Sequence, residues 1–173
     1  LWPIGTPLYD ELSDSLYVPT PGGLAAVQAD SGKPRWRLTA ELPFSPATPA
    51  AVADGIATVF AGRDAVLLDR TDGSTIWRVP LGSHSELAMA SYTRTPTVLF
   101  AGPAPMPLPD GSARLLVSGL DGRLYALDAA TGALRAELDL GAPIAAPAVV
   151  ADDLVIAIAV DGTVTAVERS RLS

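Results

Sequence analysis

The sequence predicts an all-β fold, a β-propeller with about four blades in this chain, each blade being a four-stranded antiparallel sheet. Three observations support this prediction. One apolar pattern recurs four times along the 173 residues, each copy contains a tight-turn signal, and each copy follows a proline that opens another strand. A single sheet of this kind cannot cover both of its faces, so sister sheets must stack on it. A β-sandwich would not repeat one pattern four times.

The repeated pattern is two short apolar strands joined by a turn. Its copies align without gaps, and their last residues lie 41, 59 and 40 positions apart. The copies are Leu16–Val27, Ala57–Leu68, Leu116–Leu127 and Ile156–Val167. Glycine and aspartate favour the backbone that a two-residue hairpin turn needs. The predicted turns are Gly22-Gly23, Arg63-Asp64, Asp121-Gly122 and Asp161-Gly162.

Two further strands flank each hairpin. The strand after it follows a second turn whose glycine precedes a fixed position by four residues, as in Gly32 to Trp36, Gly73 to Trp77 and Gly132 to Ala136. The strand before it starts at a proline, where the missing N–H costs least; these are Pro7, Pro49, Pro96 and Pro147. We therefore expect one propeller domain, or part of one, over 1–173, with blades at about 7–38, 47–80, 95–139 and 147–169.

Composition excludes several classes of partner. The formal net charge is −7, and the basic residues are scattered, which disfavours nucleic acid as a partner. The longest apolar run, Leu154–Val160, is far shorter than the roughly 20 residues that a membrane span needs, so we expect no direct membrane insertion. The absence of cysteine removes disulfides, thiolate metal sites and a cysteine nucleophile.

The third copy carries a family resemblance. The segments Leu124-Tyr125-Ala126-Leu127-Asp128 and Thr131-Gly132 resemble the PQQ-like, or quinoprotein-type, β-propeller repeat. The resemblance implies that Trp36 and Trp77, and Trp2 by analogy, are structural residues that dock one blade against the next. Ala136 stands where the repeat has its docking tryptophan. We therefore expect a weaker junction after the third blade.

The family includes calcium- and quinone-dependent dehydrogenases, outer-membrane assembly lipoproteins and extracellular sensor propellers. In the enzymes the quinone commonly lies under a cysteine pair, beside calcium held by carboxylate and amide groups; this chain has neither cysteine nor asparagine. We expect a non-enzymatic, non-catalytic scaffold that needs no cofactor and binds a protein, peptide or other ligand outside the cytoplasm, at the periplasm or cell surface. The alternatives are a fragment of a PQQ-dependent oxidoreductase whose cofactor site lies in absent blades, and the sensor domain of a membrane receptor.

Ring closure has two interpretations. The fourth blade ends before an outer strand, and residues 1–4, Leu1-Trp2-Pro3-Ile4, resemble such a strand. If they complete that blade, four blades close the ring. If not, the chain is part of a larger ring whose further blades come from the same or another chain, which is the interpretation we favour.

Two insertions explain the longer spacing between the second and third copies. Gly102–Gly111 has proline at alternate positions, which is typical of an extended, semi-rigid segment. We expect a surface loop there, with a possible partner-binding role for Pro103, Pro105, Met106, Pro107, Leu108 and Pro109. Ser83–Arg94 is the second candidate loop, with His84, Met89 and Tyr92. A surface loop without a partner is the alternative for both.

Neither catalytic nor metal chemistry is expected from the remaining polar residues. His84 lies between Ser83 and Glu86, but a catalytic triad converges from separate elements rather than from neighbours in sequence. The Asp-Gly pairs do not have the ligand spacing of a calcium loop, and aspartate in a turn hydrogen-bonds its own backbone. We therefore predict no catalytic residue and no metal site.

Overall fold

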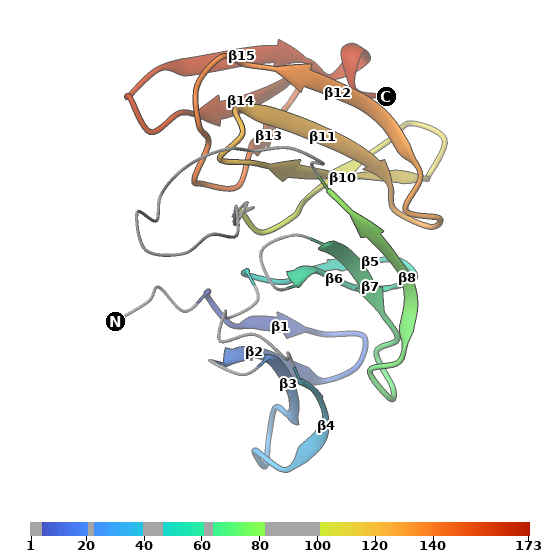
Figure 1. Ribbon diagram of the computed structural model, residues 1–173. Helices are drawn as coiled ribbons and strands as arrows, with labels where there is room; N and C mark the ends of the chain where they lie inside the picture. The colour runs from blue at the N-terminus through green and yellow to red at the C-terminus, as the bar shows by residue number, and fades with distance from the viewer. Residues whose placement is uncertain (1–4, 21–22, 40–46, 61–63, 82–100) are drawn as a thin grey trace.

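The computed structural model describes residues 5–20, 23–39, 47–60, 64–81 and 101–173. Its strands form three four-stranded sheets and one three-stranded sheet, all antiparallel, in which each strand pairs with its neighbours in sequence. The prediction of an all-β propeller-like fold is confirmed. The four sheets follow one another in chain order, from the blue blade one to the red blade four (Figure 1).

The blades are defined by their strands. Blade one contains β1 (Leu8–Asp10), β2 (Ser15–Thr20), β3 (Gly23–Gln28) and β4 (Pro34–Thr39). Blade two contains β5 (Ala50–Val52), β6 (Gly55–Phe60), β7 (Asp64–Leu68) and β8 (Thr75–Pro80). Blade three contains β9 (Ala104–Pro107), β10 (Ala113–Ser118), β11 (Arg123–Asp128) and β12 (Leu134–Asp139). Blade four contains β13 (Val149–Ala151), β14 (Leu154–Ile158) and β15 (Val164–Glu168), followed by the short 3₁₀ helix η1 (Arg169–Arg171).

Apolar side chains between successive blades form the core. The junction of blades two and three buries Ala57, Val59, Ala65 and Leu67 against Leu115, Val117, Tyr125 and Leu127. The other two junctions have their own clusters, around Tyr17 and Ile56 and around Leu116 and Val155. Because strand residues alternate between faces, each middle blade presents one apolar face forward and one backward. We call these the forward face, toward the next blade in sequence, and the backward face.

An indole links blade one to blade two. Trp36 lies on the forward face of β4, and its Nε1 donates a hydrogen bond to the Arg70 carbonyl at 2.9 Å. Gly73 has a φ of +73°, and a Cβ built there would lie 2.5 Å from the Trp36 ring. A side chain at Gly73 would therefore displace the indole. The turn needs glycine for its backbone and for its space.

The same contact links blade two to blade three. Trp77 Nε1 donates to the Ala129 carbonyl at 3.0 Å, and a Cβ on Gly132 would lie 2.8 Å from the Trp77 ring. A register shift between the third and fourth strands occurs beside each tryptophan, between Ala26 and Val27 and between Leu67 and Leu68. A β-bulge of this kind re-aims the neighbouring side chain. Blade three has the same shift between Ala126 and Leu127, beside Ala136, so the bulge belongs to the repeat rather than to the tryptophan.

The third junction is filled from the opposite side. Blade three has Ala136 at the indole position, and Ala136 packs against the cluster that contains the fully buried Leu172. Leu172 lies four residues after Glu168, as Gly73 does after Asp69. Leucine thus stands where the other blades have glycine, and alanine stands where they have tryptophan. The expectation of a weaker junction omitted this compensation, because only the indole position was considered.

The strand pairing corrects three details of the repeat. In blade one Ala26 pairs with Tyr17, whereas Leu67 pairs with Ala57, so the gapless alignment is one residue out of register in β2. Gly23 pairs with Thr20 and belongs to β3, not to the turn. In blade three Ser118 pairs with Leu124, which leaves a longer turn than two residues. The hairpin turns between the second and third strands differ in length among the blades, and the pairing register of these two strands differs with them.

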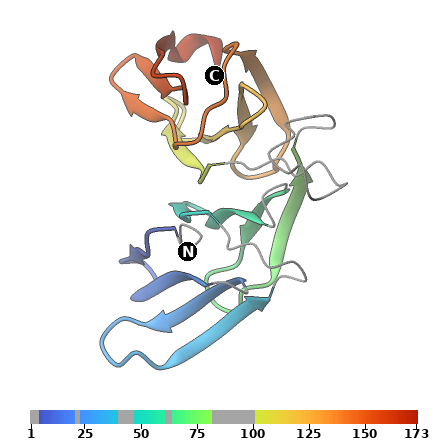
Figure 2. The same ribbon diagram turned by 60° about the vertical axis from the view of Figure 1, so that its left-hand side comes forward.

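The two end blades lie apart. Blade one and blade four are at opposite ends of the stack in both views (Figures 1 and 2). In the part of the chain that the structure describes, the four blades therefore do not close on one another. The outer strand predicted at residues 1–4, which includes Trp2, lies outside the described residues. Its role in completing blade four stays a prediction.

A double-mutant cycle tests the Ala136 and Leu172 pair. We expect Leu172→Gly to lower the free energy of unfolding by about 2–5 kcal/mol, because it leaves a cavity. Ala136→Trp alone should cost about 1–3 kcal/mol by overpacking. The double variant recreates the tryptophan and glycine arrangement of the other junctions. Its loss in the free energy of unfolding should therefore be smaller than the sum of the two single losses, by at least about 1 kcal/mol. Denaturant unfolding measures all three; additive losses would contradict this account.

Candidate functional site

The two ends of the strands form two loop-bearing surfaces. One surface carries the turns between first and second strands and between third and fourth strands; we call it the turn face. The other carries the hairpins between second and third strands and the connections between blades; we call it the hairpin face. The candidate side chains are described below by the surface, blade junction or end blade on which they lie.

A polar cluster lies at the turn face between blades one and two. Arg70 Nε donates to Asp10 Oδ2 at 3.0 Å, and Asp10 is only 5% exposed. Ser13 Oγ donates to the same carboxylate oxygen at 2.6 Å and lies 3.0 Å from the Tyr17 hydroxyl. Arg70 also donates to the carbonyls of Val52 and Ala53. The cluster ties three turns together, and burial raises the pKa of Tyr17.

Blade four uses an arginine at the same place in the repeat. Arg169 donates to the Asp152 carbonyl at 2.8 Å and, across the junction, to the Pro107 carbonyl of blade three. In both cases a guanidinium from one blade binds backbone of its own blade and a group of the preceding blade. Blade three has Ala129 at this position, and blade one has Ala29. Sequence reasoning missed both arginines; each lies two residues after the last residue of its repeat copy, Leu68 or Val167, and this equal offset was the available signal.

The acidic turns bind their own backbone. The carboxylates of Asp72, Asp110 and Asp161 each accept a hydrogen bond from the backbone N–H two residues later, at 2.8–2.9 Å. The pKa of each carboxyl lies below its usual range. The main cause is this backbone hydrogen bond for Asp72 and Asp161, and the hydrogen bond from the Ser112 hydroxyl for Asp110. Asp121 accepts from the Arg123 N–H and from the Tyr125 hydroxyl, the latter at 2.6 Å. Burial and this carboxylate raise the pKa of Tyr125.

These carboxylates do not gather into a ligand set. Among the described residues, no group of three or more His, Cys, Asp or Glu side chains is placed to hold a metal ion. No helix in the described ranges is long and apolar enough to cross a bilayer. The aspartates identified in the sequence therefore stabilise turns where the structure describes them.

The proline-rich segment is a strand, which corrects our expectation of an exposed loop. Ala104–Pro107 form β9, the first strand of blade three, and pair with β10. Met106 is fully buried in the junction with blade four, and Leu108 packs against the same cluster. Pro103 is also buried, whereas Pro105, Pro107 and Pro109 are exposed. Met106 is therefore a core residue that a partner cannot reach, and Leu108 is partly buried beside it.

The strand accommodates prolines because it is an edge strand. β9 pairs only with β10 in the sheet order, so every second N–H of β9 points away from the ladder. Pro105 and Pro107 occupy alternate positions, and their missing donors cost little there. The alternation that suggested polyproline therefore also fits a strand of period two, with Met106 facing the core. The first strand of blade three is β9 rather than the segment after Pro96.

The second candidate loop lies outside the described residues. His84, Met89 and Tyr92 are all in the range 82–100, so their binding role stays a prediction. The two ends of this connection are described: Leu81 is buried at the end of β8, and Ala101 N–H donates to the Ser118 carbonyl at 2.8 Å. Both anchors lie at the hairpin face. The connection therefore leaves and re-enters the stack beside the hairpins of blades two and three.

Exposed apolar side chains gather on blade four. Val149, Leu154, Ile158 and Val164 are 56%, 41%, 51% and 64% exposed. Cross-strand pairs place them with Ile156 and Ala166 on the forward face, opposite Val155 and Val167, which are buried against blade three. The run Leu154–Val160 is apolar at every position, so it supplies apolar side chains to both faces of β14 (Leu154–Ile158).

Removal of the Arg70 guanidinium tests the polar cluster. Arg70→Ala leaves the buried Asp10 carboxylate without its cation, so we expect a loss of about 2–4 kcal/mol in the free energy of unfolding. Arg123→Ala is the matched control, because Arg123 pairs with Glu137 on the exposed surface; its cost should stay below about 1 kcal/mol. Chemical denaturation followed by tryptophan fluorescence measures both. Equal losses for the two variants would show that the cluster contributes no more than a surface pair.

Comparison with solved structures supports the β-propeller fold. The crystal structure of BamB from Moraxella catarrhalis matches with a TM-score of 0.68 and 22% identity over 99% of this chain and 50% of that chain. The WD40 domain of Neurospora crassa Pan2 matches with a TM-score of 0.70 and 16% identity over 99% of this chain and 48% of that one. The computationally designed Ika4 protein matches with a TM-score of 0.68 and 13% identity over 96% of this chain and 91% of its own.

The chain thus spans about half the length of the BamB and Pan2 chains and nearly the whole of the designed one. The comparison with curated proteins found no match. A family model described as outer membrane protein assembly factor BamB matches residues 5–101 and 63–172, which together cover nearly the whole sequence. The chain therefore belongs to this BamB-like family of PQQ-type β-propeller repeats.

Proposed function

We propose that the chain is a non-catalytic propeller scaffold that binds a protein partner outside the cytoplasm. The observation that carries this proposal is the use of polar side chains within the fold: Asp10, Arg70, Asp72 and the two indoles all hold turns or blade junctions together. Membership of a family described as an outer-membrane assembly factor supports both the scaffold role and the extracytoplasmic location. Fractionation of cells that make the native protein tests the location.

The hairpin face is the surface we assign to the partner. The connection 82–100 is the longest between two blades, and it is held at both ends on this face by Leu81 and Ala101. It carries His84, Met89 and Tyr92, three side chains that suit a protein interface. Loops on a rigid scaffold commonly supply the binding residues of a fold. The turn face is less suited, because its arginines are already bound to backbone carbonyls.

A loop variant tests this assignment. We expect the triple change His84→Ala, Met89→Ala and Tyr92→Ala to reduce recovery of the partner from extracytoplasmic extracts at least about tenfold, because an interface depends on a few large side chains. The readout is quantitative mass spectrometry of proteins cross-linked to purified chain. The melting temperature should stay within about 2 °C of the parent, since surface substitutions change stability little.

The matched control places three alanines on exposed outer strands, at Thr75, Leu134 and Glu137, where no partner is expected. Recovery by this variant should equal that of the parent chain. If the loop variant recovers its partner as well as the control does, the binding surface is not this connection.

A cofactor titration tests the non-catalytic part of the proposal. We expect no saturable change in quinone absorbance and no rise in melting temperature when the chain is titrated with pyrroloquinoline quinone and calcium, alone and together. A ligand at 100 times its dissociation constant would stabilise the fold by about 2.7 kcal/mol, which thermal unfolding detects easily. A concentration-dependent rise would support the oxidoreductase alternative instead.

A further inference from the structure

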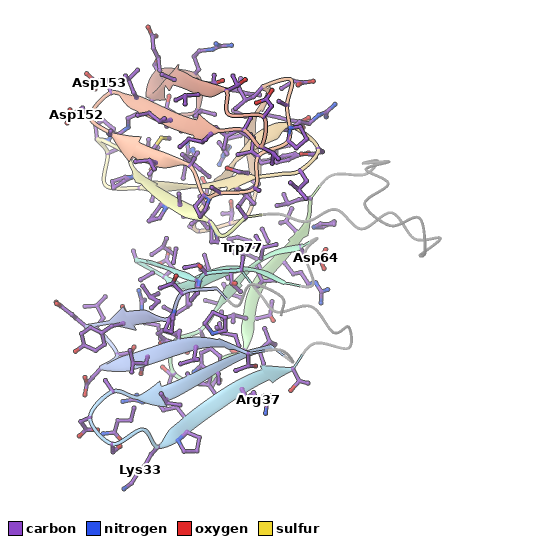
Figure 3. The ribbon with its side chains drawn as sticks, turned by 90° about the vertical axis from the view of Figure 1, so that its left-hand side faces the viewer. Lys33, Arg37, Asp64, Trp77, Asp152 and Asp153 are labelled. Atoms are coloured by element: carbon purple, nitrogen blue, oxygen red, sulfur yellow. The ribbon has the colours of Figure 1, made fainter. Side chains whose placement is uncertain are left out.

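The outer strand of blade one carries a row of exposed cations, which we call the cationic stripe. It consists of Lys33, Arg35 and Arg37, at alternate positions in and just before β4, and all three are exposed. Residues 31–40 contain these three basic residues and no acidic one. Figure 3 shows Lys33 and Arg37 at the surface of blade one. Because the exposed Asp30 offsets part of the charge at Lys33, the two arginines are the dominant part of the stripe.

The exposure of the stripe does not depend on the place of blade one in the chain. The equivalent positions in blades two and three have a preceding blade in the structure, and they are exposed there as well. These positions are Ser74, Ile76 and Arg78 in blade two, and Ala133, Arg135 and Glu137 in blade three. A preceding blade therefore leaves this side of an outer strand open to solvent.

Arginines at these positions in the other blades bind a carboxylate of their own sheet. In blade two, Arg78 binds Asp64, the first residue of β7. In blade three, Arg135 binds Asp128, the last residue of β11, at 3.0 Å. The outer strands of blades two and three thus use their arginines within the fold.

Blade one has neutral residues at the places of both carboxylates. Gly23 pairs with β4 as Asp64 pairs with β8, and the Gln28 N–H donates to the Lys33 carbonyl as the Asp128 N–H donates to that of Ala133. An acid does not fit at Gly23, because a Cβ there would overlap the Leu38 carbonyl oxygen. Among the described residues, no carboxylate lies within ion-pair distance of the two stripe arginines.

The stripe lies on an open sheet edge. In the part of the chain that the structure describes, β4 pairs only with β3, so alternate backbone N–H and C=O groups of β4 face away from the sheet. An extended peptide can add to such an edge through its own backbone. Side chains at alternate positions of an extended peptide lie about 7 Å apart, which is also the repeat of Arg35 and Arg37 along β4.

We propose that β4 binds an extended acidic segment of a protein partner, which adds to blade one as a further strand. Carboxylates at alternate positions of that segment pair with Arg35 and Arg37. Charge complementarity identifies the occupant, because the stripe is a cationic surface on a chain of net charge −7. The same cations oppose pairing with β4 of a second copy, since like charges would then face each other. The site is separate from the hairpin face and does not depend on the partner proposed there.

Fluorescence anisotropy of a labelled peptide in which glutamate alternates with threonine tests the proposal. We expect saturable binding that weakens as salt is raised. Arg35→Gln combined with Arg37→Gln should raise the dissociation constant at least about fivefold, because two ion pairs are lost. Arg78→Gln combined with Arg135→Gln is the matched control: it removes the same charge at equivalent positions of blades two and three and should change the constant less than about twofold.

Two further measurements separate the stripe from general charge attraction. Gln28→Asp supplies the carboxylate that blade three has at this place, so it should weaken binding about two- to threefold while every cation stays in position. Peptides N-methylated at one or the other set of alternate residues test the backbone contact. Only the set whose N–H groups face β4 should lose binding, because those groups donate to the strand edge.

Several results would overturn the proposal. An edge whose cations serve only to prevent self-association would bind no peptide at any concentration. Equal losses for the two double variants would show attraction without a site, and equal binding of both N-methylated peptides would exclude strand addition. Tighter binding of anionic phospholipid vesicles or of a sulfated polysaccharide to the stripe would assign it to another class of partner. The melting temperature of each variant is measured beside its affinity, so that a loss of folding is not counted as a loss of binding.

Discussion

The packing of an indole on the glycine turn of the following blade is the contact on which the rest of the stack depends. Each blade is a thin sheet, and neither face is covered until a neighbour packs on it. Trp36 and Trp77 fix that neighbour in two ways, through a hydrogen bond to a carbonyl of the turn and through a ring that fills the space above Gly73 or Gly132. The hydrogen bond and the ring contact together hold each indole against the turn of the following blade.

The third junction shows that the constraint is volume rather than residue identity. Leu172 contributes from the following blade the bulk that an indole contributes from the preceding one, and Ala136 leaves room for it. Core packing tolerates such exchanges when total volume is conserved. What the exchange removes is the indole hydrogen bond, and Arg169, which binds the Pro107 carbonyl across the same junction, supplies a polar link in its place.

Local signals predicted the strands well, because glycine turns and alternating apolar residues act within a few residues. They predicted pairing less well. The register of β2 in blade one depends on turn length, which a gapless alignment cannot reveal, and the strand β9 was concealed by prolines that only an edge position allows. The partner of Arg70 could not be predicted, because Asp10 lies 60 positions away in the sequence. Turn aspartates such as Asp161 were predictable, because their partner lies two residues away.

The repeat also explains why the end blades differ from the surface of an ordinary domain. A position that is buried in every internal junction is apolar for that reason, and an end blade free in solution would gain solubility from polar residues there. Blade four instead retains Ile158 and Val164 on its forward face, beside an outer edge of β15 that has no partner among the described strands. Terminal repeats of stacked folds are normally capped with polar residues. The forward face of blade four therefore has the composition of an internal junction rather than that of a capping repeat.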